Sequence, residues 1–226
     1  MNYPFSYFDN HIVAYINGKS CLIDTGSPIS IGEGILKIAG QTHQISNNMF
    51  GAASLGDISN QVGVELDFLI GGDILSKHYG LFIWLKKREV IFSGTIRKDA
   101  VVNLELFSNV PIICLQINNK LVKAYIDTGA RQSYISPSLA FDSIHEGEVS
   151  DFYPGYGPMR APVVSAAYSI ENIKNNDNFK FAILPEDLSS LLFMAECNAI
   201  LGVDWLLDGD CNCFQINYEN RNFIND

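Results

Sequence analysis

The chain has 226 residues, of which 47% are hydrophobic and 18% charged, so it has ample apolar material for a core and is not intrinsically disordered. Its net charge of −10 excludes the basic surface that nucleic-acid binding needs, and no apolar run reaches the roughly 18 residues of a membrane helix. We therefore expect neither a nucleic-acid partner nor a membrane, and one large domain or two small ones.

The N-terminal residues have no basic segment followed by an apolar one, so no signal peptide is visible and a cytoplasmic location is expected. An odd number of cysteines in a chain of this length is not a disulfide framework, so reduced thiols are expected. The pair Cys211 and Cys213 lacks a second pair or a nearby histidine that would complete a zinc site. We expect no metal and no other cofactor.

The first predicted element is a β-hairpin over residues 11–23, with Asn17-Gly18 as its tight turn. Its second strand runs directly into Asp24-Thr25-Gly26. After a variable segment come Leu69-Ile70-Gly71, a short apolar stretch that fits one or two helical turns, and a hairpin formed by residues 81–85 and 89–92. Strand patterns dominate, which predicts an all-β protein.

The same order of elements then recurs. Residues 112–126 predict a hairpin with an Asn-Asn turn, which leads into Asp127-Thr128-Gly129, 103 positions after the first copy. Ile200-Leu201-Gly202 and a hairpin of residues 214–218 and 222–224 follow. The middle segment is longer here, and its stretches 153–158 and 171–178 are predicted to be turns or loop tips. The repeat divides the chain into residues 1–97 and 98–226.

Two Asp-Thr-Gly motifs, each followed by two aliphatic residues and a glycine, resemble the aspartic proteases, and in particular their compact, retropepsin-like (retroviral-type) branch. The resemblance covers nearly the whole chain. It implies two tandem retropepsin-like β-barrel lobes related by a pseudo-twofold axis, with short helices after the aliphatic-aliphatic-Gly motifs. Pepsin-like enzymes also join two lobes in one chain, so a monomer that has undergone internal duplication would suffice.

The candidate catalytic residues are Asp24 and Asp127. They could simply start turns, because aspartate and glycine are common turn residues. However, both follow apolar strands, where a carboxylate is costly unless it is hydrogen-bonded or functional. Two adjacent carboxyls cannot both ionise cheaply, so the pair holds one proton, and one member acts as a general base while the other acts as a general acid.

Four further motif residues have predicted supporting roles around this dyad. Gly26 and Gly129 allow sharp turns that present backbone N–H groups to the carboxyls. By the resemblance, the hydroxyls of Thr25 and Thr128 cross-link the two loops, whereas ordinary β-propensity would also explain a threonine at either position.

The residue after each motif differs between the copies. Ser27 can donate a hydrogen bond to an ionised carboxylate and Ala130 cannot, so Asp24 is expected to be the more acidic member. Alanine at this position resembles the retroviral enzymes, which implies activity at mildly acidic pH. Asp73 and Asp204 also recur after the downstream glycines. Because a helix start is expected there, helix capping is the favoured role for both.

Family members close a β-hairpin flap over the substrate, and two segments are candidates. Residues 47–53 include Phe50 and Gly51, and residues 153–159 include Tyr153, Gly155, Tyr156 and Gly157. Either segment could instead be an ordinary surface loop. Tyr153 and Tyr156 are equal candidates for contact with substrate.

The sequence thus predicts an aspartic endopeptidase, a hydrolase that binds an extended peptide or protein substrate largely through main-chain hydrogen bonds. The alternative is a peptide-binding or regulatory module that keeps the fold with weak catalysis. A precursor that requires processing is a third interpretation.

Overall fold

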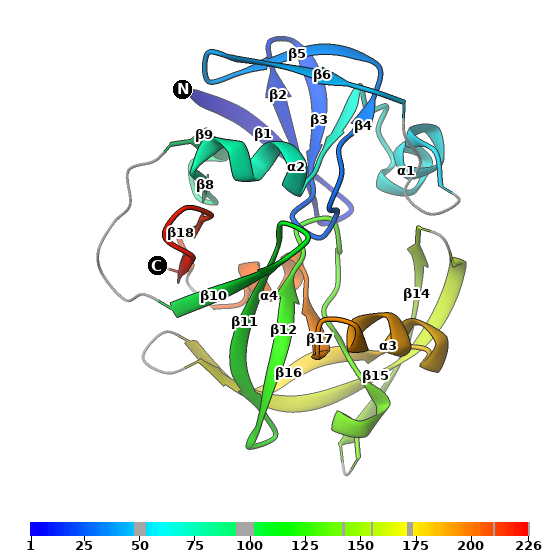
Figure 1. Ribbon diagram of the computed structural model, residues 1–226. Coiled ribbons are helices and arrows are strands. Elements are labelled where there is room, and N and C mark those ends of the chain that lie inside the picture. The colour runs from blue at the N-terminus through cyan, green and yellow to red at the C-terminus, as the bar shows by residue number, and fades with distance from the viewer. Residues whose placement is uncertain are drawn as a thin grey trace.

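The computed structural model describes residues 1–47, 53–93, 102–141, 143–154, 156–170, 174–209 and 211–225. Most of these residues lie in strands and the helices are short, which confirms the predicted all-β class. Figure 1 shows the N-terminal half of the chain, in blue to cyan, above the C-terminal half, in green to red. The predicted boundary at residues 97 and 98 lies outside the described residues.

In the N-terminal half, the predicted hairpin is formed by β2 and β3, and its turn residues Asn17 and Gly18 have φ angles of 52° and 79°. The second predicted hairpin, β8–β9, is also confirmed. The elements of this half are β1 (Asn2–Phe8), β2 (His11–Ile16), β3 (Lys19–Ile23), β4 (Ile31–Gly32), β5 (Gly34–Ile38), β6 (Gln41–Ile45), α1 (Leu55–Val62), β7 (Phe68–Ile70), α2 (Gly72–Leu75), the 3-10 helix η1 (Ser76–His78), β8 (Gly80–Trp84) and β9 (Glu89–Phe92).

The C-terminal half repeats this order with a longer middle segment. Its elements are β10 (Val102–Phe107), β11 (Val110–Ile117), β12 (Lys120–Ile126), β13 (Tyr134–Ile135), the 3-10 helix η2 (Pro137–Leu139), β14 (Ile144–Tyr153), β15 (Gly157–Ile170), β16 (Lys174–Ile183), α3 (Glu186–Phe193), β17 (Cys197–Leu201), α4 (Val203–Leu207), β18 (Cys213–Asn217) and β19 (Asn222–Asn225). The prediction of a loop tip was wrong for residues 174–178. These polar residues belong to β16, because Asn175 and Asn176 pair with Ser169 and Tyr168 of β15.

Each half threads its downstream aliphatic strand beside the strand that leads to the aspartate. β7 lies between β3, to which it is parallel, and β4, to which it is antiparallel. β17 lies in the same way between β12 and β13. The backbone N–H of Asp24 donates to Ile70 O at 3.0 Å, and that of Asp127 donates to Leu201 O at 2.9 Å. The position of each aspartate is therefore fixed by a buried strand of its own half.

Close backbone approach explains the glycine after each aliphatic pair. A Cβ atom at Gly71 would lie 2.4 Å from the carbonyl oxygen of Ile29, and one at Gly202 would lie 2.6 Å from that of Gln132. Both neighbours are backbone atoms of the loop that follows the aspartate, so they cannot move aside cheaply. The aliphatic-aliphatic-Gly motif thus supports the Asp-Thr-Gly loop from below.

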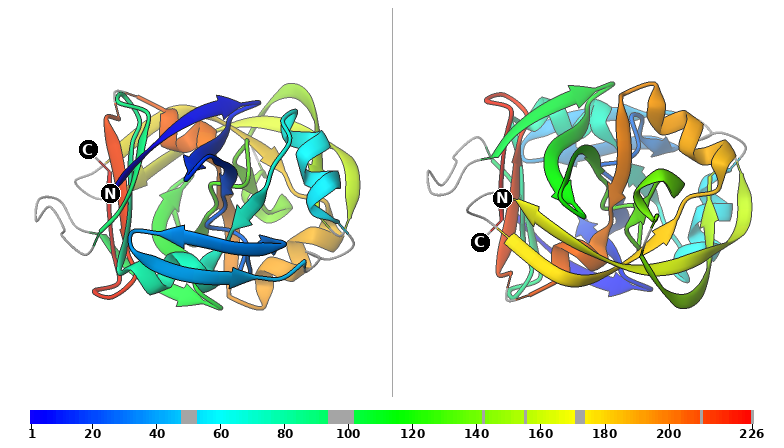
Figure 2. Two further views of the ribbon diagram at one scale, coloured as in Figure 1. Left: turned by 90° about the horizontal axis from the view of Figure 1, so that it is seen from above. Right: turned by 90° about the horizontal axis from the view of Figure 1, so that it is seen from below.

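A six-stranded antiparallel sheet joins the two halves, in the order β1–β9–β8–β18–β19–β10. Its central pair, β8 and β18, runs in register from Gly80↔Asn217 to Trp84↔Cys213. Figure 2 shows this sheet on one side of the molecule, opposite α1 and the tip of the β14–β15 hairpin. The halves are therefore joined by main-chain hydrogen bonds as well as by side chains.

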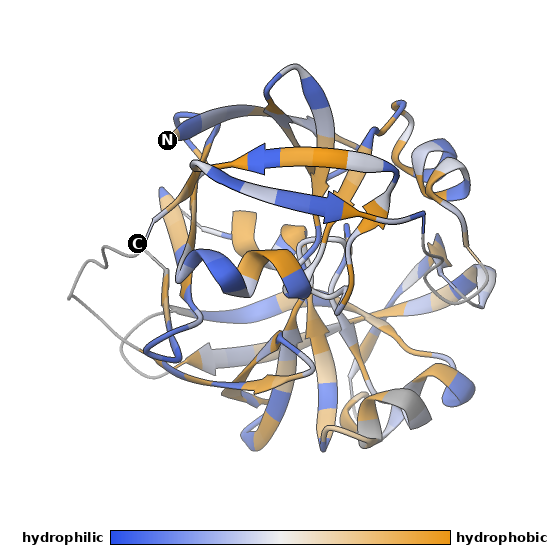
Figure 3. Cartoon of the chain, turned by 45° about the horizontal axis from the view of Figure 1, so that its top comes forward, coloured by the Kyte–Doolittle hydropathy of each residue, from blue (hydrophilic) through white to orange (hydrophobic). Residues whose placement is uncertain are grey.

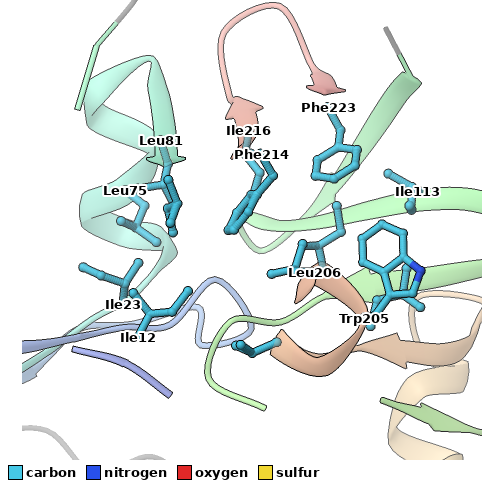
Figure 4. Close-up of a cluster of buried hydrophobic side chains, with 14 of the residues drawn as sticks. Ile12, Ile23, Leu75, Leu81, Ile113, Trp205, Leu206, Phe214, Ile216 and Phe223 are labelled. Atoms are coloured by element: carbon cyan, nitrogen blue, oxygen red, sulfur yellow. The ribbon is translucent and has the colours of Figure 1, made fainter. Parts of the chain in front are cut away.

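One large apolar core extends through both halves beneath the two aspartate loops. Figure 4 shows Ile12, Ile23 and Leu81 of the N-terminal half close to Phe214 and Leu206 of the C-terminal half. Trp205 and Phe214 are fully buried there. Burial of this size contributes the main favourable term in folding, and here it fixes the two halves relative to each other.

The halves differ in what they place outside this shared frame. The N-terminal half adds the helix α1 and the hairpin β5–β6, in which β5 is the more apolar strand and β6 the more polar one (Figure 3). The C-terminal half adds the long antiparallel strands β14, β15 and β16. Of these additions, which lie in the variable middle of each repeat, the sequence predicted only a candidate hairpin flap at residues 153–159, where β14 turns into β15.

Candidate active site

The structure brings Asp24 and Asp127 together at the interface of the two halves, where their carboxyl groups are hydrogen-bonded to each other. A Cβ atom on Gly26 would lie 2.1 Å from Cγ of Asp127, and one on Gly129 would lie 2.3 Å from Cγ of Asp24. Each carboxyl group therefore rests on the glycine of the opposite loop. No residue with a side chain would fit in either place.

Backbone N–H groups hold one oxygen of each carboxyl group. Gly26 N and Ser27 N donate to Oδ1 of Asp24 at 3.0 and 2.9 Å. Gly129 N and Ala130 N donate to Oδ1 of Asp127 at 2.9 and 3.2 Å. Such donors favour the ionised form of a carboxyl group and fix its orientation.

The threonines of the two motifs bond across the interface. Oγ1 of Thr25 donates to Ile126 O at 2.7 Å and accepts from the N–H of Thr128 at 3.0 Å. Oγ1 of Thr128 donates to Ile23 O at 2.6 Å and accepts from the N–H of Thr25 at 3.0 Å. Both side chains are fully buried. These four reciprocal hydrogen bonds lock one loop to the other, because a buried polar group without a partner would be costly.

Burial raises the pKa of both carboxyl groups, and the neighbouring charge of Asp127 raises that of Asp24 further. The pair therefore holds one proton over a range of pH in which isolated aspartates are ionised. The hydrogen bond from the Ser27 hydroxyl to Asp24, on which the expected acidity of Asp24 was based, is not formed. The Ser27 hydroxyl donates to Ile29 O at 2.7 Å, so Ser27 serves Asp24 through its backbone N–H, as Ala130 serves Asp127.

Asp73 and Asp204 are tied to the aspartate loops, which corrects their predicted role as helix caps. The N-caps of α2 and α4 are Gly71 and Gly202, and neither makes a side-chain capping bond. Instead, Asp73 Oδ1 accepts from the Ser30 hydroxyl, and Asp204 Oδ1 accepts from the Ser133 hydroxyl, both at 2.6 Å.

The two serines in turn accept from the backbone N–H groups of Gly71 and Gly202, at 3.0 and 2.9 Å. Burial raises the pKa of Asp204 to about 6, although its bonds to Ser133 oppose the shift. Sequence reasoning missed Ser30 and Ser133. The signal was present, because each lies six positions after its aspartate.

The hairpin β14–β15 covers the dyad from the C-terminal half. Tyr153, at the end of β14, lies beside both aspartates: burial and the charges of Asp127 and Asp24 raise its pKa to about 12. Tyr156 lies at the tip and is 46% exposed, and Gly157 begins β15 opposite Tyr153. Of the other flap candidates, Phe50, Gly51 and Gly155 lie outside the described residues.

A cavity of about 250 Å³ lies between this hairpin and α1 of the N-terminal half. Its apolar part comes from Leu22, Leu69 and the α1 residues Ile58 and Val62, and Asp24 lies at its edge. A smaller cavity of about 80 Å³ contains both aspartates and is lined by Tyr153. The helix α1 was missed from the sequence, although Ser54 and Asp57 form a capping box that signals its start.

Arg131, immediately after the second motif, is a further residue that sequence reasoning missed. Its guanidinium contacts Asp151 on β14 and Asp9 in the turn between β1 and β2. It lines both cavities together with Asp151.

Other features of the described residues bear on what the site can do. They include no group of three or more metal-ligating side chains, and no helix long and apolar enough to cross a membrane. All five cysteines are free. The reactive groups at the site are the paired carboxyl groups of Asp24 and Asp127, which border a cavity.

Comparison with known proteins adds little at the level of sequence. No protein-family profile matches the chain, and no curated protein matches it in sequence. Among solved structures, the chain is similar to a retropepsin-like aspartic protease from Rickettsia conorii. The match has 17% identity and a TM-score of 0.39, and covers 56% of this chain and 89% of that one. A similarity at this level carries no argument about the chemistry of the present site.

Proposed function

We propose that this protein is an aspartic endopeptidase, a retropepsin-like hydrolase that uses Asp24 and Asp127 to activate water against a peptide bond. One observation carries the proposal: two half-buried carboxyl groups are hydrogen-bonded to each other on loops that the threonine hydroxyls cross-link. Burying two acids side by side is costly, and a shared proton at the edge of a cavity is the arrangement that general acid–base catalysis requires.

In the proposed reaction, the ionised carboxylate takes a proton from water as the water oxygen bonds to the peptide carbonyl carbon. The protonated carboxyl donates its proton to the carbonyl oxygen, which gives a tetrahedral diol. The diol then returns one proton to the ionised carboxylate while the dyad protonates the amide nitrogen and the C–N bond breaks. A carboxylic acid and an amine leave, and the dyad again holds one proton.

The proposal treats residues 1–97 and 98–226 as two lobes that each supply one aspartate. A single chain would then be sufficient, and specific activity would not fall on dilution. The substrate would lie extended between α1 and the β14–β15 hairpin, and its side chains would enter the two cavities.

The direct test is cleavage of a diverse peptide library from about pH 3 to 7, the range over which paired carboxyls titrate. Asp24→Asn and Asp127→Asn are expected to abolish cleavage. Asp177→Asn, which makes the same change at an exposed position of β16, is the matched control and is expected to leave it intact. Cleavage that survives either dyad substitution would refute the assignment.

Binding without turnover would instead support the alternative of a catalytically weak peptide-binding module. A statine-type peptide, which mimics the diol, separates the two. The endopeptidase binds it more tightly than the matching substrate peptide, and loses that preference in Asp24→Asn. A module binds both peptides equally.

A further inference from the structure

Arg131 joins three segments that meet over the dyad. It follows Asp127 by four positions, so its backbone belongs to the catalytic loop. Its Nε donates to Asp151 Oδ1 at 3.1 Å, and Nη2 donates to the carbonyl oxygen of Ser150. Its Nη1 donates to Asp9 Oδ2 at 2.7 Å. The first two contacts remain within the C-terminal half, and the third crosses to the opposite half.

Asp151 is the point at which the hairpin is held. Its carboxylate accepts from Arg131, from the hydroxyl of Tyr134 and from the N–H of Phe152. Side chains two positions apart in a strand share a face, so Asp151 and Tyr153 face the same way. Fixing Asp151 therefore fixes Tyr153 beside the dyad.

The two ion pairs differ in burial. The side chain of Asp151 is 14% exposed, whereas that of Asp9 is 54% exposed. An exposed pair is weak and is screened by salt, while a partly buried one is screened much less. The Arg131–Asp151 contact is thus the durable one, and the Arg131–Asp9 contact is the one that can be released at low cost.

The N-terminal half has no equivalent of this arrangement at the same position. Pro28 occupies the place in the first loop that Arg131 occupies in the second, four positions after the aspartate. A proline side chain carries neither charge nor hydrogen-bond donor. The contact is therefore a specific addition to the C-terminal loop and does not come from the repeat.

We propose that Arg131 is a positioning residue that holds the β14–β15 hairpin closed over the dyad. Its pairing with Asp151 shapes the hairpin, and its pairing with Asp9 fastens the closed hairpin to the opposite half. Substrate enters when the Arg131–Asp9 pair opens. Arg131 acts through the hairpin and takes no part in proton transfer. As a catalytic role, this rests on the proposed endopeptidase function.

Hydrogen exchange followed by mass spectrometry tests the contact without any substrate. In Arg131→Met, peptides from residues 144–170 are expected to exchange at least about tenfold faster, the factor that a lost charged hydrogen bond gives. Arg131→Lys, which keeps the charge but not the fork of donors, should lie between. Arg160→Met, an exposed arginine on the same hairpin, is the matched control and should exchange like the native protein. Unchanged exchange in Arg131→Met, or faster exchange spread over both halves, would overturn the proposal.

The salt dependence of KM distinguishes a positioning role from a purely structural one, because a purely structural role of Arg131 would leave it unchanged. Raising the salt concentration is expected to increase KM of the native enzyme by a factor that Asp9→Asn abolishes, because salt screens the exposed pair. A salt effect that persists in Asp9→Asn would overturn the role of the crossing contact. If Arg131→Met loosens the hairpin but no variant cleaves peptides, the endopeptidase function fails while the hairpin contact stands. If the native protein cleaves peptides but Arg131→Met does not change exchange in the hairpin, the hairpin contact fails while the endopeptidase function stands.

Discussion

Asp24 and Asp127 are held by matching sets of hydrogen bonds, yet the segments that cover them are unrelated. Around each aspartate, two backbone N–H groups, a threonine from the other loop and a serine–aspartate pair recur in the same places. Outside this frame, the N-terminal half presents the helix α1 and the C-terminal half presents the β14–β15 hairpin.

The difference shows which part of the molecule needs symmetry. Under the proposed function the two carboxyl groups share one proton, and the matching hydrogen bonds lie around that pair. The proposed peptide substrate has a direction, so the segments that would contact it have no reason to match. The following predictions test this division.

The largest effect is expected from alanine at the glycines beneath the dyad. In Gly26→Ala and Gly129→Ala, the new Cβ would lie 2.1 and 2.3 Å from the opposite carboxyl carbon, so the two carboxyls must move apart. Each variant should lose at least about a hundredfold in kcat/KM, as expected for misplaced catalytic groups.

Gly56→Ala in α1 is the matched control for these two variants. The nearest atom to its Cβ is Ser54 Oγ at 3.6 Å, so activity should be unchanged. If one of the two variants, Gly26→Ala or Gly129→Ala, lost all activity while the other kept native activity, the two aspartate loops would not be equivalent and the prediction would be wrong.

An intermediate effect is expected from a buried histidine pair that belongs to the N-terminal half. His43 on β6 and His78 on η1 are hydrogen-bonded at 2.9 Å and buried. Burial, His43 and Lys77 lower the pKa of His78 from 6.5 to about 4. Burial also lowers the pKa of His43, with a further lowering by Lys77 that Asp73 opposes.

The unfolded chain therefore binds this proton more tightly than the folded one. The stability that the neutral His78 contributes is fully present above about pH 6.5 and is lost as the pH falls towards about 4, by an amount on the order of 3 kcal/mol. Urea unfolding at pH 7 and pH 4 should show this loss in the native protein and a smaller one in the double variant His43→Leu, His78→Leu. The exposed His145→Gln serves as control, and equal losses in the native protein and the double variant would contradict the prediction.

The smallest effect is expected at the two tyrosines of the hairpin, which the sequence left as equal candidates. Tyr153 lies beside the dyad and Tyr156 is at the exposed tip. Tyr153→Phe should lower kcat/KM by about three- to tenfold, the value of one hydrogen bond, and Tyr156→Phe should leave it unchanged. Steady-state kinetics on one peptide substrate measure both values of kcat/KM. A larger loss in Tyr156→Phe than in Tyr153→Phe would contradict the prediction and assign the substrate contact to the tip of the hairpin.

The features that the sequence predicts well are local or repeated. The hairpin turns at Asn17-Gly18 and Asn118-Asn119 follow from short-range conformational preference, and the structure confirms both. The hydrogen bond between Asp24 and Ile70 is long-range, but the sequence still indicates it, because only glycine fits at position 71 after the aliphatic pair.

The features that it does not predict depend on the folded loop. The direction of the Ser27 hydroxyl is set by how near Ile29 O lies, which no spacing encodes. The serine partners of Asp73 and Asp204 lie 43 and 71 positions earlier in the chain, in the loops after the two catalytic-motif aspartates. The helix-capping preference considers only neighbouring residues, so it assigned both aspartates to helix caps instead. The residues next to Arg131 in the sequence also form no recognisable motif. Its role arises from the carboxylates of Asp9 and Asp151, which are distant in the sequence.

The six-stranded sheet also has a consequence for the folding kinetics. Its central strands, β8 and β18, are separated by more than a hundred residues, and both halves must be present before they can pair. Closing so long a loop is slow compared with forming the local hairpins. The hairpins should therefore form early during refolding, while the carboxyl pair assembles only when β8 and β18 pair, so recovery of the site lags behind recovery of the strands.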